Sequence, residues 1–303
     1  MVSERVRSVA GQAAAPAVAA MELPALYLAA DRQAAAAERR FTRLVLLEIA
    51  LPVITVVFSS VATVTGPTRW LGYAAVFTIA IVGALRVVER TSQIELQWYR
   101  ARSFAEDVKS LAWRFAMEAP PFPPDMDGRD AETQFLERLR ALTRHQTGLA
   151  PPDAGDEITT SMRQLRGMTL PERAVAYRDS RLRDQQRWYQ QRARRLALAG
   201  QRWDVAFFLC VASTIVAGTI VVATANAAPV AGIASAAAGA VIGWTGVRRL
   251  TGTSGLYARM ATELSLEQSA APQHCTPGEW SVYVDAVERQ LGREHAQWRS
   301  ARQ

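Results

Sequence analysis

Residues 205–247 read VAFFLCVASTIVAGTIVVATANAAPVAGIASAAAGAVIGWTGV, and none of these 43 residues is Asp, Glu, Lys or Arg. A helix needs roughly 20 apolar residues to cross a bilayer, whereas a helix in a soluble core is usually amphipathic. Asn226 and Pro229 mark a turn that divides the stretch into two apolar runs. The stretch therefore predicts a hairpin of two membrane-spanning helices, at about 203–225 and 229–247.

An earlier part of the chain has the same character. Between Arg43 and Arg69 the only charged residue is Glu48, and the 16 residues after Arg69 carry no charge. We expect a second hairpin here, with spans at about 44–65 and 70–88. Long polar helices surround both hairpins, and no strand pattern persists. The predicted fold class is an all-α integral membrane protein, with two transmembrane hairpins and long cytoplasmic helices that form a bundle.

The arginines predict the orientation of the hairpins. They cluster before the first and third spans and after the second and fourth, and only Arg69 lies near a hairpin turn. Cytoplasmic segments next to membrane spans carry an excess of Lys and Arg. We therefore expect a multi-pass protein of the cell (inner/plasma) membrane, with both turns outside and with cytoplasmic N- and C-termini.

Charge and cysteine usage narrow the classes of function. The net charge of +7 could attract nucleic acid. However, the arginines concentrate beside the spans, where anionic lipid headgroups are a simpler partner. We expect contacts with membrane lipids and none with nucleic acid. Cys210 lies in an apolar run and Cys275 in a polar tail, so we expect no disulfide and a reducing compartment.

A search for catalytic chemistry finds little. His274, Cys275 and His295 are the only conceivable metal ligands, and their spacing matches no familiar site. No glycine-rich phosphate loop follows a strand, and no Ser-His-acid or Cys-His arrangement stands out. We expect no catalytic residue, no metal and no cofactor, and hence a protein that is not an enzyme.

The order of the elements indicates a duplication. The predicted parts are a disordered N-terminus at 1–22, a first unit at 23–118, a Pro-rich linker with one short helix at 119–157, and a second unit at 158–303. A cleaved signal peptide is the alternative for the first part, but that part lacks a Leu-rich run.

Each unit places an acid near the start of its hairpin and an arginine near the end. Glu48 and Arg86 hold these positions in the first unit, and Asp204 and Arg248 hold them in the second. The two helices of a hairpin run antiparallel, so each acid and its arginine lie at a similar depth. We expect an ion pair at each membrane boundary, because pairing lowers the cost of burying both charges. The alternative is that each side chain extends to water alone.

Two polar helices carry aromatic and charged residues at helical spacing. The first face consists of Trp98, Arg102, Glu106, Lys109 and Trp113, and the second contains Tyr177, Arg181, Asp184 and Trp188. Within each set the side chains share one side of a helix. We expect the two faces to pack against each other or against a neighbouring subunit. A ligand-binding face is the alternative interpretation.

The fourth predicted span has small residues along one side, namely Gly232, Ala236, Gly239, Gly243 and Gly246. Small residues allow the backbones of membrane helices to approach closely, as in the GxxxG pattern. We expect this stripe to pack against the third span or against a second copy in a homo-oligomer. A pore-lining role is the alternative.

Several short motifs resemble the SLATT family of membrane effector domains, which are associated with nucleotide-signalling bacterial conflict systems. The resembling residues are Leu23-Pro24-x-x-Tyr27, Trp98-x3-Arg102-x3-Glu106-x2-Lys109-x3-Trp113, Asp184-Gln185-Gln186-Arg187-Trp188-Tyr189, and Glu294 with Trp298. They extend over most of residues 23–300, as two tandem units. The helix at 33–40 departs from the Trp-Tyr pattern of the second unit.

The resemblance implies a paired-helix membrane domain that oligomerises. It also implies that a cytoplasmic nucleotide or a nucleotide-signalling partner triggers a pore, which would arrest or kill the cell during phage attack. A membrane-anchored scaffold or sensor is the alternative function, in which the cytoplasmic bundle binds a partner or ligand and the hairpins serve only as anchors.

Overall fold

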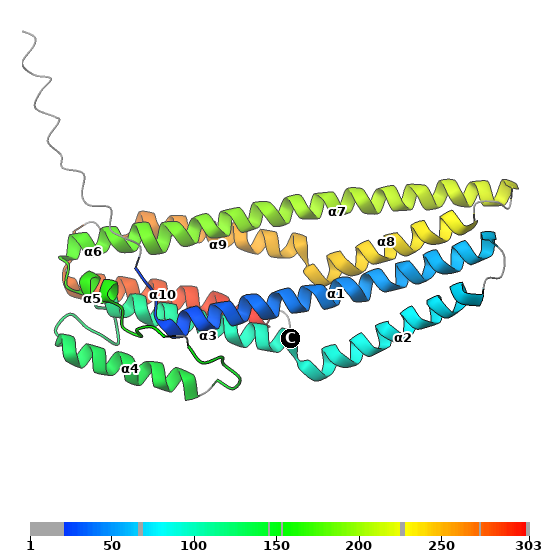
Figure 1. Ribbon diagram of the computed structural model, residues 1–303. Helices are drawn as coiled ribbons and strands as arrows, with labels where there is room; N and C mark the ends of the chain where they lie inside the picture. Colours follow the sequence, from blue (N-terminus) through cyan, green and yellow to red (C-terminus); the bar gives the residue numbers. More distant parts are fainter. Residues whose placement is uncertain are drawn as a thin grey trace, which may run out of the picture.

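A computed structural model describes residues 21–65, 69–144, 146–152, 154–224, 228–272 and 274–300, and these ranges contain helices and no strand. The helices are α1 (Ala25–Thr65), α2 (Arg69–Ser92), α3 (Ile94–Ala116), α4 (Gly128–Arg144), α5 (Thr160–Arg166), α6 (Leu170–Tyr177), the π-helical turn η1 (Arg178–Leu182), α7 (Arg183–Thr224), α8 (Ala228–Arg248), α9 (Leu250–Ala270) and α10 (Pro277–Ser300). Figure 1 shows an elongated molecule, with a helical bundle at one end and two hairpins at the other.

Two long helices extend through both ends of the molecule. α1 has 41 residues and α7 has 42, and each begins in the bundle and ends at a hairpin turn (Figure 1). At 1.5 Å per residue such a helix is about 60 Å long, roughly twice the thickness of the hydrocarbon core. The predicted polar helices and the spans that follow them are therefore continuous. Both helices stay continuous although α1 contains Pro52 and α7 contains Gly200 near the point where the polar part meets the apolar part.

The segments that lead back from each hairpin turn to the bundle differ from these two helices, because each segment is divided into two helices by one residue. α2 and α3 are separated by Gln93, and α8 and α9 are separated by Arg249. Both residues have left-handed backbones, with φ of 47° and 43°. A non-glycine residue rarely adopts this conformation. The same break at the same position in both units supports the predicted duplication.

Three helical stretches are long and apolar enough to cross a membrane, by length and composition. They are Ala25–Val61, Leu170–Thr224 and Ala228–Ala270, and the span predicted at 70–88 corresponds to the shorter apolar stretch Gly72–Val88. Together with the helical content, these stretches confirm the predicted fold class. The turn predicted at Asn226, and the turn at Pro67 that the two spans of the first hairpin imply, lie outside the described ranges.

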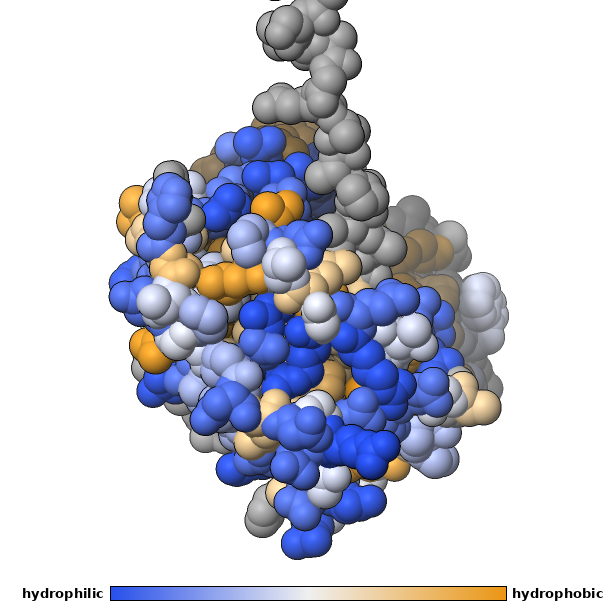
Figure 2. All heavy atoms as spheres, turned by 90° about the vertical axis from the view of Figure 1, so that its left-hand side faces the viewer, coloured by the Kyte–Doolittle hydropathy of each residue, from blue (hydrophilic) through white to orange (hydrophobic). Residues whose placement is uncertain are grey.

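The hairpins expose apolar side chains instead of burying them. Phe77 on α2 is 66% exposed, and Phe208 and Val222 on α7 are 68% and 91% exposed. Such a surface is unfavourable in water and matches the interior of a bilayer. By contrast, Figure 2 shows mostly hydrophilic residues on the end of the bundle that faces away from the hairpins.

The core of the bundle is shared by both units. α3 lies at its centre, where Phe104 and Val108 are fully buried, and α10 contributes Trp280 and Val284 from the end of the chain. α3 also packs against α1, α4, α5 and α10. The units at 23–118 and 158–303 therefore do not form separate cores.

The segment at 119–157 does more than connect the two units, which corrects the interpretation of it as a linker. Phe122 and Phe135 are fully buried against Phe115 of α3, with ring centroids 5.6 Å and 5.3 Å from it. α4 is amphipathic, since its apolar positions recur every four residues from Ala131 through Phe135 to Leu139. The prolines that favour a linker here only end the preceding helix, and the apolar residues between them complete the core.

Candidate functional site at the junction of the two units

A buried ion pair joins η1 to α10. Arg181 donates from Nε to Glu288 Oε1 at 2.9 Å and from Nη2 to Glu288 Oε2 at 2.8 Å, and the two side chains are 3% and 0% exposed. The Tyr177 hydroxyl also donates to Glu288 Oε1, at 3.0 Å. Burial raises the pKa of the Tyr177 phenol, so this hydroxyl keeps its proton. The bidentate geometry and the extra donor offset part of the desolvation of both charges, whereas Arg181 Nη1 is buried without an acceptor among the described residues.

Glu288 is a buried acid that sequence reasoning missed. Its side chain points from the apolar side of α10, among Val284, Val287 and Leu291, which are all buried. An acid within the apolar stripe of a helix indicates a buried carboxylate that needs a partner, and this pattern could have identified Glu288 from the sequence. Its partner Arg181 was predicted, but the sequence does not show which acid it meets.

The predicted charged face of α3 turns partly toward α1. Arg102 contacts Asp31 of α1 at 2.9 Å and Glu106 on its own helix at 2.6 Å. The Lys109 ammonium lies over the Tyr27 ring, 6.0 Å from its centroid. Burial lowers the pKa of Lys109 and raises that of Tyr27 to about 12.

The two predicted faces meet within one chain. Trp113 of α3 packs edge-on against Tyr177 of α6, with ring centroids 5.7 Å apart. The Arg102 guanidinium lies 5.9 Å from the ring centroid of Trp188 on α7. Two predicted members behave differently: Trp98 stacks on Phe41 of α1, and the side chain of Asp184 is exposed.

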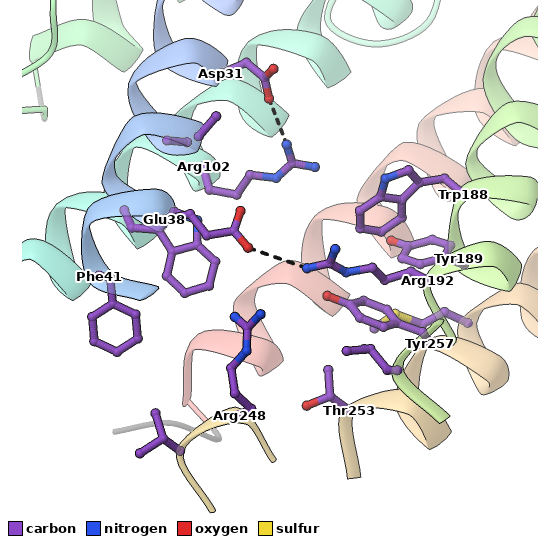
Figure 3. A pocket seen from close by; sticks show the side chains of 16 residues that line it. Asp31, Glu38, Phe41, Arg102, Trp188, Tyr189, Arg192, Arg248, Thr253 and Tyr257 are labelled. Atoms are coloured by element: carbon purple, nitrogen blue, oxygen red, sulfur yellow. Dashed lines mark hydrogen bonds and ion pairs between the residues drawn. The ribbon is translucent and has the colours of Figure 1, made fainter. Parts of the chain in front are cut away.

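Beside these contacts lies a cleft of about 320 Å³, between the bundle and the membrane ends of the helices. We call it the junction cleft. Its residues are Asp31, Ala34, Ala35, Glu38, Phe41, Trp98, Arg102, Trp188, Tyr189, Arg192, Leu196, Val247, Arg248, Thr253, Tyr257 and Met260. In Figure 3, Glu38 of α1 and Arg192 of α7 reach toward each other across it, and Arg248 of α8 enters from the membrane side. The Glu38 Oε1 and Arg192 Nη2 atoms are 3.5 Å apart.

The two predicted boundary pairs have different outcomes. Arg86 Nη1 lies 3.4 Å from Glu48 Oε2, with the Glu48 side chain 7% exposed and the Arg86 side chain 66% exposed. Among the described ion pairs, none joins Asp204 to Arg248. Asp204 is exposed, and the Arg248 guanidinium lies over the Trp244 ring, 5.1 Å from its centroid.

The small-residue stripe of α8 is divided between two environments. A side chain at Gly232 would meet Val56 of α1, and one at Gly243 would meet Ile49 of α1, both at 3.9 Å. At Gly239 and Gly246 no described atom outside the adjoining part of the helix itself lies within 4 Å of the position a side chain would take. The packed part of the stripe thus faces the first span, and the packing predicted for the stripe, against the third span or a second copy, stays a prediction for its open part.

Among the described residues, no group of three or more His, Cys, Asp and Glu side chains has the proximity to hold a metal ion. Cys210 and Cys275 are both free thiols. The side chain of His295, one of the three conceivable ligands, lies outside the described part of the chain.

Comparison with family models matches both units. Residues 24–174 match the SMODS and SLOG-associating 2TM effector domain 3, and residues 177–298 match the SMODS and SLOG-associating 2TM effector domain 1. The chain therefore belongs to the SLATT family, with two tandem domains. These domains are two-transmembrane effectors associated with conflict systems. The first match includes residues 119–157, in agreement with their packing. No curated protein and no solved structure matches the chain.

Proposed function

We propose that this protein is an effector of a bacterial anti-phage system, located in the inner membrane with both termini in the cytoplasm. A cytoplasmic trigger acts on the bundle, the chain oligomerises, and the spans form a pore. The observation that carries this proposal is the continuity of α1 and α7 from the bundle into the hairpins. A rigid helix transmits a displacement at one end to the other, so a change in the bundle reaches the membrane directly.

The open part of the α8 stripe supports oligomerisation. Gly239 and Gly246 have free space beside them, although neighbouring positions pack against α1. Close approach of a second helix at small residues is a common mode of association in membranes. We propose that α8 of a second copy fits here.

The pore is tested by leakage. The full chain, reconstituted into vesicles that contain a fluorescent dye, should release the dye, and its expression should depolarise cells. Replacing both hairpins with unrelated membrane hairpins should abolish leakage. Expression without leakage in either system would reject the pore and favour the alternative function of a membrane-anchored scaffold or sensor, which hairpin replacement would leave intact.

Oligomerisation is tested by crosslinking. Gly239→Leu combined with Gly246→Leu should reduce the crosslinked species, because two bulky side chains fill the open face. Gly72→Leu combined with Gly83→Leu is the matched control, since both of these α2 glycines also border open space. An equal effect of the two pairs would reject a specific role for α8.

A further inference from the structure

We propose that the junction cleft binds a ligand that carries a phosphate group, with the phosphate on Arg192 and Arg248. Two sources supply this chemistry: a soluble nucleoside phosphate or the headgroup of an anionic phospholipid. The inference deepens the proposed function, because it places a binding event between the bundle and the spans. The effect of the ligand on the spans rests on the proposed function, whereas binding of the ligand can be measured independently of it.

Charge is the first argument. Three arginines and two carboxylates line the cleft. Arg102 contacts two carboxylates, those of Asp31 and Glu106. The other two arginines lie nearer the membrane side and approach the cleft from different helices (Figure 3). Guanidinium groups that converge from two directions are suited to the oxygens of a phosphate.

The contacts of Arg192 are the second argument. Its only ion pair in the described structure, with Glu38, has a separation of 3.5 Å, and the two side chains are 39% and 35% exposed. Its Nε atom is buried and has no hydrogen-bond acceptor among the described residues. A partly exposed and loosely formed pair contributes little, and a buried donor without an acceptor is unfavourable. A phosphate oxygen would satisfy the donor and displace Glu38.

The apolar walls are the third argument, since they accept the organic part of the ligand. Trp188 is 41% exposed and lies next to Tyr257, with ring centroids 5.6 Å apart. Aromatic faces of this kind stack with a nucleobase. Leu196 and Val247, at the membrane side, offer aliphatic surface that an acyl chain would cover. A volume of about 320 Å³ lies within the range of small-molecule sites.

The position of the cleft links binding to the hairpins. Val247 and Arg248 lie on α8 just before the left-handed residue Arg249, whereas Thr253 and Tyr257 lie on α9 just after it. A ligand in the cleft therefore contacts both sides of this break. Bringing Arg248 onto a phosphate changes the angle between a membrane helix and a bundle helix, and a bend at one residue can accommodate it.

Binding is tested with the full chain purified in uncharged detergent. ATP and inorganic pyrophosphate serve as soluble probes, measured by calorimetric titration. Phospholipid is tested by native mass spectrometry of protein from nanodiscs of phosphatidylcholine with and without phosphatidylglycerol. For whichever probe binds, Arg192→Gln should lower the affinity by about tenfold, because one charge-assisted contact is lost. Arg194→Gln, an exposed position on the same helix, should leave affinity unchanged.

Glu38→Gln separates binding from misfolding. Removing the competing carboxylate should tighten phosphate binding by up to about fivefold, which loss of structure cannot produce. Trp188→Leu distinguishes a nucleotide from a phospholipid. It should weaken binding of ATP strongly and binding of phosphatidylglycerol only slightly. Binding of either source with this pattern supports the proposal. No binding of any probe, or binding that Arg192→Gln and Glu38→Gln leave unchanged, overturns it, whether or not the protein leaks vesicles.

Discussion

Helices α3 and α9, which follow the left-handed residues, occupy equivalent positions in the two units but have different environments. Counted from the left-handed residues Gln93 and Arg249, both helices bury positions 11, 12 and 15. These residues are Phe104, Ala105 and Val108 on α3, and Met260, Ala261 and Leu264 on α9. Each unit thus contributes one apolar face to the bundle at the same place.

The second face differs between the two helices. Positions 9, 13, 16 and 20 are Arg102, Glu106, Lys109 and Trp113 on α3, and Ala258, Thr262, Ser265 and Ser269 on α9. The four residues on α9 are all exposed, whereas those on α3 contact α1, α6 and α7. The two helices therefore share one apolar face. Only α3 carries a second face, and its residues contact helices of both units.

The largest effect is expected at the buried ion pair between η1 and α10, which lies beside Tyr177, the residue against which Trp113 of α3 packs. Glu288→Ala should lower the free energy of unfolding by about 3–5 kcal/mol, because it leaves Arg181 as a buried charge without its carboxylate. Chemical unfolding in detergent, followed by circular dichroism, measures this. Glu263→Ala removes a pair on the exposed side of α9 and should stay within about 0.5 kcal/mol. Equal effects would contradict the comparison.

The buried face of α9 provides the next test. Leu264→Ala should cost about 2–5 kcal/mol, because the side chain is 3% exposed and its removal leaves a cavity. Leu266→Ala, at a position 66% exposed, should change stability by no more than about 0.5 kcal/mol. A large loss at Leu266 would show that α9 has a second buried face, as α3 does.

The hairpins allow the same comparison at the membrane boundary. Arg86→Gln should cost about 1–3 kcal/mol in detergent or bicelles, since it removes a cation that lies 3.4 Å from the buried Glu48 carboxylate. Asp204→Asn in the second unit should be neutral within about 0.5 kcal/mol, because Asp204 is exposed. Adding Glu48→Gln to Arg86→Gln should recover part of the loss if the two side chains interact.

The smallest effect concerns the two breaks, where the units are alike. Gln93→Gly and Arg249→Gly should each raise stability by up to about 1 kcal/mol, because glycine adopts a positive φ without strain. Ser265→Gly, inside α9, should instead cost about 0.5 kcal/mol. A loss of stability at only one break would show that the two breaks are not equivalent.

The sequence by itself determined the apolar hairpins, the helical class, the repeated order of elements and the resemblance to the family. Each of these properties depends on the length of an apolar run or on the spacing of charges within a single helix, and both can be read directly from the sequence. It also identified both charged faces. It predicted that they pack against each other or against a neighbouring subunit, and in the structure Trp113 of the first face packs against Tyr177 of the second.

The tertiary structure alone decided which surfaces meet. Glu288 lies more than one hundred residues from Arg181, the segment at 119–157 joins the core, and Gly232 packs against α1. The junction cleft likewise combines side chains from five helices. Such pairings depend on how helices are arranged in space, and several arrangements satisfy the same periodic pattern in each helix. Only packing of the whole chain selects one of them.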